Sequence, residues 1–239
     1  MKYKLIAALL ALTLAQSALA FEEGQWFIRS GLANVAPGSS SDGIAIPALG
    51  ISPIAGTEAE AEVETQLGIT INYMINQRFS IELLAATPFK HELTADLNGF
   101  SPGLKVDAGS VKQLPPTLSV NYYPFGDSAQ RFQPYVGLGL NYTLFFSEHV
   151  DSDLEALTGT LAGAAGPVAM DLELDDSIGV AAQIGFDYVI SNKWYVNAAV
   201  RYIDIETDAT FTSALGDTIT VDNVEIDPLV YQFTLGYAF

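Results

Sequence analysis

The chain has 239 residues, a formal net charge of −18 at pH 7 and no cysteine. These values argue against a basic nucleic-acid binder, whose surface must attract phosphates, and they exclude disulfide frameworks and thiol chemistry. Hydrophobic residues make up 49% of the sequence and charged residues only 16%, which is too apolar for a disordered chain and poorer in charge than an average soluble protein, with about 25%.

The first 20 residues have the features of a secretory signal peptide. Two lysines precede the apolar run 5–15, and Ala18 and Ala20 place small residues before a cleavage point. An uncleaved membrane anchor is the alternative, but the run is much shorter than the ~20 residues that a spanning helix needs. We therefore expect residues 1–20 to be a signal peptide and residues 21–239 to form one barrel domain.

The rest of the chain contains no apolar run long enough for a spanning helix, but it shows the two-residue period of β-strands. Large apolar side chains occupy one face of each segment, and small or polar side chains occupy the other. Because the bulky face is the apolar one, we expect it to contact lipid and the small face to line a barrel interior. The eight expected strands are residues 25–35, 67–75, 79–93, 111–123, 132–147, 177–190, 194–208 and 229–239.

The connections between these segments alternate between long loops and short polar turns. In chain order they are residues 37–57, 76–78, 94–110, 126–131, 150–176, 191–193 and 209–218. This alternation predicts an all-β fold: an eight-stranded antiparallel transmembrane β-barrel, an up-and-down meander with short periplasmic turns and four long outer loops. Aromatic side chains beside the short turns are expected to form a periplasmic girdle, namely Tyr73, Tyr122, Tyr123, Tyr188 and Trp194.

Several motifs resemble the OmpW/AlkL family of small outer-membrane β-barrel proteins, over most of residues 67–239 outside the long loops. They are Leu83-Leu84-Ala85-Ala86-Thr87-Pro88-Phe89-Lys90-His91, Leu114-Pro115-Pro116-Thr117-Leu118, Pro134-Tyr135-Val136-Gly137, Gly139-Leu140-Asn141-Tyr142-Thr143 and Val196-Asn197. The resemblance implies an eight-stranded barrel in the outer membrane of a Gram-negative bacterium. It also implies binding or conduction of small hydrophobic molecules, as in the alkane-uptake branch, whereas the residues alone predict only the barrel.

Prolines interrupt two neighbouring expected strands. Pro88 lies within segment 79–93, and Pro115 and Pro116 lie within segment 111–123. Proline has no backbone N–H, so it weakens or ends strand pairing. We hypothesise a lateral opening in the barrel wall at these prolines, through which an apolar solute leaves into the outer leaflet. The alternative is that pairing ends at the membrane rim and that the prolines only cap strands.

The alternation also predicts which apolar side chains line the lumen or its outer vestibule. These candidates for ligand contact are Met74, Leu84, Ala86, Val106, Phe145 and Val189. An apolar lining would bind a hydrocarbon and hold no continuous file of water. The alternative is that an eight-stranded barrel is narrow and that these side chains simply fill it.

Four charged side chains are expected to face the lumen on the same alternation: Arg29, Glu82, Asp187 and Arg201. Because an isolated buried charge costs several kcal/mol, we expect these groups to pair. The resulting network would lie toward the periplasmic half and block a straight water pore. A ring that selects ions is the functional alternative.

The long connections 37–57 and 150–176 differ in character. The first is apolar and either packs over the barrel mouth or lines an entry funnel. The second is acidic, and its start at Asp151 resembles a calcium loop, but Ala156 and Ala162 stand where an EF-hand requires Gly and Glu. We expect a solvated surface loop, with loose divalent-cation bridging to lipopolysaccharide as the alternative.

Enzyme chemistry is poorly supported by the sequence. The chain has two histidines, His91 and His149, and we find no serine, histidine and acid set of the kind that outer-membrane lipases use. Dinucleotide and phosphate-loop motifs are absent. We expect no catalytic residues, no metal and no cofactor.

The leading expectation is a monomeric outer-membrane channel for passive uptake of small hydrophobic molecules, with lateral release. The alternatives are a narrow ion-conducting pore and a structural or receptor barrel that acts through its outer loops. Expected partners are outer-membrane lipid and lipopolysaccharide, small hydrophobic solutes or detergent, and the barrel-assembly machinery, whose recognition signal the terminal Phe239 resembles. No nucleic acid is expected.

Overall fold

We describe the protein from a computed structural model that covers residues 21–38, 40–45, 53–99, 101–126 and 130–239. The expected signal peptide, residues 1–20, lies outside the described residues, as does part of the apolar connection 37–57. Within the described ranges, no helix is long and apolar enough to cross a membrane.

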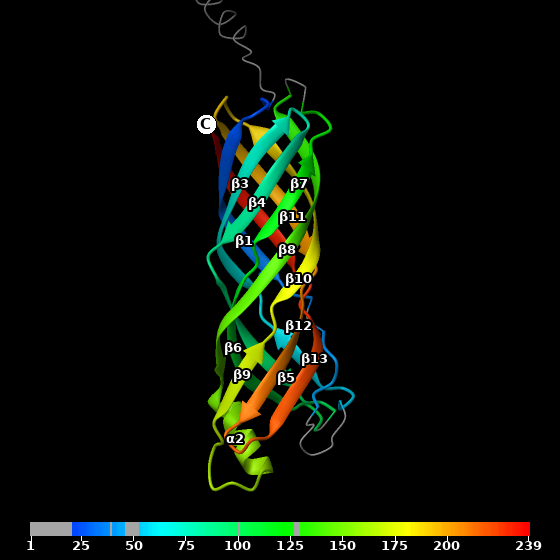
Figure 1. Ribbon diagram of the computed structural model, residues 1–239, viewed down its shortest axis with the longest axis vertical. Coiled ribbons are helices and arrows are strands. Elements are labelled where there is room, and N and C mark those ends of the chain that lie inside the picture. Colours follow the sequence, from blue (N-terminus) through cyan, green and yellow to red (C-terminus); the bar gives the residue numbers. More distant parts are fainter. Residues whose placement is uncertain (1–20, 39, 46–52, 100, 127–129) are drawn as a thin grey trace, which may run out of the picture.

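The described chain consists almost entirely of antiparallel strands (Figure 1). The elements are β1 (Trp26–Ala36), β2 (Glu58–Ala61), β3 (Glu64–Asn76), β4 (Phe79–Ala86), β5 (Phe89–Asp96), β6 (Lys105–Leu114), β7 (Thr117–Tyr122), β8 (Phe132–Val150), α2 (Ser152–Leu161), β9 (Met170–Leu174), β10 (Ser177–Val189), β11 (Trp194–Ile203), β12 (Glu206–Ser213), β13 (Thr218–Glu225) and β14 (Leu229–Ala238).

Eight of these strands close into a barrel. Their order around the wall is β8, β10, β11, β14, β1, β3, β4 and β7, and the ring closes because β7 also pairs with β8. The pairing of β1 with β14 joins the first and last strands, as an up-and-down meander requires. The predicted eight-stranded antiparallel barrel is therefore confirmed.

The bulky face of each barrel strand is exposed, as the two-residue period predicts. Leu138 and Leu140 of β8 are 73% and 66% exposed, and Ile178 of β10 is 79% exposed. The alternate positions carry glycine or buried polar side chains, such as Asn141 and Gln183. Exposed apolar side chains over a polar interior are the arrangement of a barrel that is solvated by lipid.

The girdle prediction is correct except at one position. Tyr122, Tyr188 and Trp194 are exposed beside the short turns, and Trp194 contacts the ring of Tyr237 edge-on. Tyr123 is fully buried, because it continues the inward face that Thr117, Ser119 and Asn121 form along β7. It belongs to the lumen and not to the girdle.

Three of the expected strands are each divided into two. Residues 79–93 form β4 and the start of β5, residues 111–123 form the end of β6 and β7, and residues 194–208 form β11 and the start of β12. The parts that belong to β5, β6 and β12 leave the barrel and continue beyond its long-loop end (Figure 1).

An outer extension is built on the long-loop end of the barrel, where loops were expected. The strands β6, β5 and β2 continue the barrel sheet from the second half of β8, while β13, β12 and β9 form a separate sheet beside it. The helix α2 follows β8, and its N-cap Asp151 accepts a hydrogen bond from the backbone N–H of Asp153. The connection 150–176 is thus a helix and a strand, and not a purely solvated loop.

Candidate functional site

Four charged side chains meet inside the barrel, in the half nearer the short turns. Arg29 donates to Glu82 and to Asp187, with N–O distances of 2.5 Å each, and Arg201 donates to Glu82 at 2.5 Å. All four residues are at most 1% exposed. Two cations and two anions balance, so the barrel interior carries no net charge at this level.

Neutral side chains complete this ionic network. Tyr123 accepts from Arg29 at 2.8 Å and donates to Asp187 at 3.2 Å, and Gln183 donates to Glu82 at 3.0 Å while accepting from Arg201. Charges at such depth are stabilised only when their remaining hydrogen bonds are also made. The network therefore fills the lumen with fixed polar groups.

A cluster of aromatic and apolar side chains lies on the short-turn side of the ionic network. Phe21 stacks on Phe27, and the rings of Tyr123, Tyr135 and Tyr195 pack close by. The other members are Met74, Val189, Ala199 and Ala238. Ionic network and aromatic cluster together close the barrel toward the short turns.

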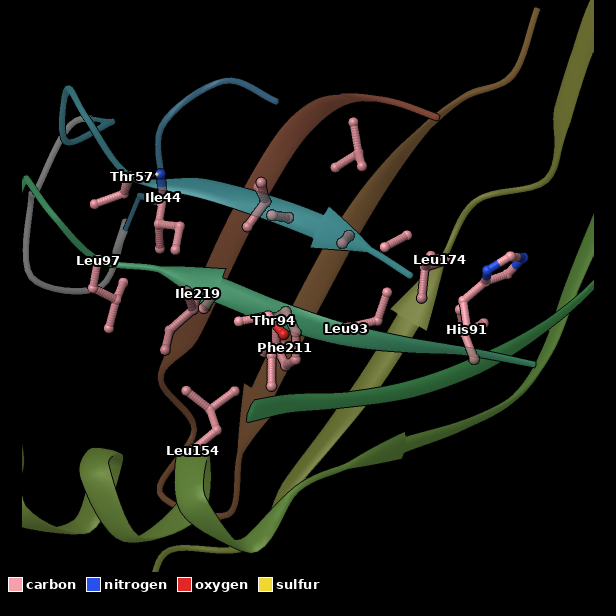
Figure 2. Close-up of a pocket in the computed structure, with 18 of the residues that line it drawn as sticks. Ile44, Thr57, His91, Leu93, Thr94, Leu97, Leu154, Leu174, Phe211 and Ile219 are labelled. Carbon is pink, nitrogen blue, oxygen red and sulfur yellow. Dashed lines mark hydrogen bonds between the residues drawn. The ribbon is translucent and has the colours of Figure 1, made fainter. Parts of the chain in front are cut away.

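The outer extension, in contrast, encloses an apolar cavity of about 130 Å³. Its wall combines β2, β5 and β6 with β12 and β13, and Phe145 of β8 and Leu154 of α2 complete it. Figure 2 shows Leu154, Phe211 and Ile219 pointing into this space from three different elements. None of the lining residues is Asp, Glu, Lys or Arg. We call this space the outer cavity.

His91 and Gln113 form the barrel-side floor of the outer cavity. His91 lies at the opposite end from Ile44, Thr57 and Leu97 in Figure 2. Its Nδ1 is 2.8 Å from the carbonyl oxygen of Glu62, and its Nε2 is 2.9 Å from Nε2 of Gln113. Burial lowers the pKa of His91, and the hydrogen bond to Glu62 only partly opposes that effect.

A second, smaller cavity of about 10 Å³ lies beyond this floor. Gln113 lines both cavities and so separates them. Leu84 and Ala86 of β4 line the smaller cavity on one side, and Pro115 lines it on the other. Between these two sides, the hydrogen-bonded pairing of the barrel strands is interrupted.

We call that interruption the proline seam. The pairing of β4 with β7 ends at Leu84 and Thr117, and the pairing of β5 with β6 begins at Phe89 and Gln113. Residues 85–88 and 114–116 form no strand pairs with each other across the seam. The hypothesised weak point in the wall therefore coincides with a gap in the ladder, with Pro88 on one side and Pro115 and Pro116 on the other.

Five of the six predicted lumen residues divide into two groups, whereas Val106 is only half-buried and lines neither cavity. Leu84, Ala86 and Phe145 line the cavities. Met74 and Val189 are also buried in the interior, but they belong to the aromatic cluster on the other side of the ionic network. A solute in the outer cavity would not reach these two.

Sequence reasoning did not identify the floor pair or most of the cavity wall. In the sequence alone, His91 stands out as part of the family motif and as one of two histidines, and Gln113 does not stand out. Phe211 and Ile219 lie on β12 and β13, which replace the expected loop 209–218. Their alternation of apolar and polar residues was the available signal.

The remaining candidates lie away from the cavities. His149 is exposed on β8, and the terminal Phe239 is 70% exposed next to Tyr237 at the short-turn end. In the part of the chain that the structure covers, no three His, Asp or Glu residues are grouped as metal ligands.

Comparison with known proteins places the chain among outer-membrane barrels. Residues 22–239 match the OmpW family. The chain is 42% identical to outer membrane protein W of Vibrio cholerae over 234 residues, which is 97% of this chain and 96% of that protein. The crystal structure of the outer membrane protein OprG from Pseudomonas aeruginosa superposes with a TM-score of 0.80 at 36% identity, covering 93% of this chain and 99% of OprG.

More distant similarities extend to two other proteins. The outer membrane protein AlkL of Ectopseudomonas oleovorans is 28% identical over 178 residues, or 74% of this chain and 66% of AlkL. The dibenzothiophene metabolism operon protein PahQ of Pseudomonas aeruginosa is 26% identical over 218 residues, or 91% of this chain and 90% of PahQ.

Proposed function

The chain belongs to the OmpW family, and from this membership we propose that it admits small hydrophobic molecules through its outer cavity and releases them sideways into the outer membrane. Like its relatives, it is an outer-membrane protein of a Gram-negative bacterium. Transport is passive and follows the gradient of the solute.

The observation that carries this proposal is the position of the outer cavity relative to the ionic network and the proline seam. The cavity has an apolar wall, which favours an apolar solute over water. Below it, Arg29, Glu82 and Arg201 close the lumen. The proline seam lies between the outer cavity and the ionic network, so a sideways path avoids the closed part of the lumen.

The chemistry of the seam supports the same path. Opening a paired strand boundary would expose N–H and C=O groups to hydrocarbon, at a cost of several kcal/mol per group. Pro88, Pro115 and Pro116 have no N–H to expose. The carbonyl of Pro116 already accepts hydrogen bonds from Tyr142 and Asn141, so it is satisfied without a partner across the seam.

The name of one relative supports an apolar solute. PahQ is described as a protein of a dibenzothiophene metabolism operon, and dibenzothiophene is an apolar molecule. We take from this only that the solute is largely apolar.

Replacing Pro88 and Pro116 with valine tests the route. The valines restore two N–H donors, pairing extends across the seam, and entry of an apolar solute becomes several-fold slower. The measurement is the uptake of 1-N-phenylnaphthylamine, an apolar dye, by intact cells that contain equal amounts of folded barrel.

The matched control is Pro134→Val, because Pro134 lies in β8 opposite Phe186, in an unbroken part of the barrel wall. Dye entry in this control should equal that of the unmodified protein. Unchanged entry in the Pro88→Val, Pro116→Val double variant would rule out release at the seam.

The proposal involves no enzymatic step and no cofactor. His91 contacts a carbonyl and an amide, and it contacts neither a serine hydroxyl nor a carboxylate through the hydrogen bonds of its ring. The partners we propose are membrane lipid and lipopolysaccharide around a monomer, apolar solutes, and the barrel-assembly machinery at Phe239.

A further inference from the structure

The floor of the outer cavity is polar, whereas most of its wall is apolar. His91 and Gln113 are 2% and 0% exposed, and each could be replaced by an apolar side chain if the cavity served hydrocarbons alone. Buried polar groups are costly unless they are hydrogen-bonded. The hydrogen-bond partners of these two side chains therefore indicate which polar group a bound solute should carry.

The positions of the protons on this pair follow from its neighbours. The carbonyl of Glu62 can only accept, so Nδ1 of His91 carries the proton and donates to it. In the neutral imidazole Nε2 is then an acceptor, and it must receive a hydrogen from the amide nitrogen of Gln113. This fixes the orientation of the Gln113 amide.

This arrangement leaves one hydrogen-bond acceptor without a donor. Oε1 of Gln113 is buried and has no hydrogen-bond partner among the described residues. Thr57, another polar residue of the cavity wall, donates to the carbonyl of Ile54 and accepts from the N–H of Ile44. The cavity floor thus lacks one donor.

We propose that the outer cavity prefers elongated apolar molecules that carry one neutral hydrogen-bond donor, such as an aliphatic alcohol or a phenol, and that Gln113 accepts this hydrogen bond. The inference rests on the proposed function and adds a substrate class to it. Leaving a buried acceptor unpaired is penalised, so an analogue that lacks the donor binds less tightly.

The location of Gln113 makes it the selecting residue. It lines both the outer cavity and the smaller cavity beside Pro115, so a solute meets it between entry and the proline seam. The lining contains no aspartate or glutamate that would pair with a cationic ammonium donor, and no lysine or arginine that would hold a carboxylate. The donor must therefore come from a neutral group.

The test compares 1-decanol with decyl methyl ether, which keeps the oxygen but has no donor. Both compounds compete with an apolar fluorescent probe for the protein in lipid nanodiscs, and their partition into protein-free nanodiscs is measured in parallel. We expect the alcohol to bind about tenfold more tightly than the ether. In the His91→Phe, Gln113→Met double variant, which also removes the imidazole acceptor that Gln113 covers, that preference should fall to about onefold while the affinity for the ether is kept.

The control variant is Gln133→Met, because Gln133 is equally buried but lies on β8 near the short turns. It should keep the full preference for the alcohol. Folding of each variant is checked by heat-modifiable gel migration, and the comparison of the two ligands on the unmodified protein needs no variant.

The outcomes separate the two proposals. Equal binding of alcohol and ether to the unmodified protein would overturn the donor preference and leave hydrophobic uptake standing. Failure of both compounds to displace the probe would overturn the cavity as a hydrophobic site, and with it the proposed function. A preference that survives in the double variant would overturn the role of the floor pair, and with it that of Gln113.

Discussion

At the scale of single residues, the protonation state of His91 follows from the groups that face it. Phe89 stacks against the ring, Gln113 occupies one nitrogen and the Glu62 carbonyl the other, while Glu64 is the nearby charge that favours the cation. Burial outweighs that charge, so the pKa of His91 is lowered. The side chain is neutral at pH 7.

This arrangement predicts the pH response of the site. Above about pH 6.5, the ordinary pKa of histidine, the imidazole is neutral in the folded and the unfolded chain. As the pH falls below that value, the unfolded chain binds a proton that the folded site excludes, so stability decreases until the lowered pKa is reached.

The measurement is a nuclear magnetic resonance titration of the imidazole in nanodiscs, with the urea-unfolded chain as reference. We expect His91 to titrate below the reference. A midpoint equal to or above the reference would contradict a buried neutral pair.

At the scale of elements, α2 forms part of the wall of the outer cavity. Leu154, Leu157 and Leu161 of this helix line the cavity. The helix begins at a capping interaction between Asp151 and the N–H of Asp153, 3.0 Å apart. A short helix depends strongly on such a cap and on its apolar face.

Replacing Asp151 with alanine should therefore loosen this wall. Loss of an N-cap costs about 1 kcal/mol, which corresponds to roughly fivefold faster local opening. Hydrogen exchange of residues 152–161 measures this change. Asp153→Ala is the matched control, because it removes an acidic side chain from the same turn but keeps the cap. If exchange is unchanged in Asp151→Ala, the cap does not hold the helix.

The sequence predicted the barrel strands better than the outer extension, and the prolines explain the difference. In β4 the inward residues are Glu82 and Leu84, at even positions, whereas in β5 they are Phe89 and His91, at odd positions. An unbroken alternation through Pro88 would place His91 on the outside. The side-chain period is reliable within one ladder and is lost where the ladder is interrupted.

At the scale of the whole molecule, the two halves of the interior have opposite characters. Toward the short turns the lumen is filled by the ionic network and the aromatic cluster, and toward the long loops it holds the outer cavity. The four charges could be predicted from alternation, because each lies in an unbroken barrel strand. The cavity could not, because it depends on contacts between elements far apart in the chain.

This asymmetry predicts the electrical behaviour of the protein. In planar bilayers the unmodified protein should conduct ions poorly. Glu82→Ala removes the anion that Arg29 and Arg201 share and leaves Asp187 as the one carboxylate opposite two arginines. Because the aromatic cluster still fills the lumen, the conductance should stay low, and the residual current should become several-fold more selective for anions.

Glu92→Ala is the control, because Glu92 is exposed and pairs with Lys90 outside the barrel. Its conductance should match that of the unmodified protein. A large steady current through the unmodified protein would instead favour the narrow ion-conducting pore.

The length of β8 has a further consequence. Its 19 residues pair with β7 and β10 in the barrel and with β6 in the extension. One strand thus joins the wall of the outer cavity to the barrel wall beside the proline seam. Insertions or deletions at the loop tips should therefore leave the height of the cavity above the seam unchanged, because β8 sets it.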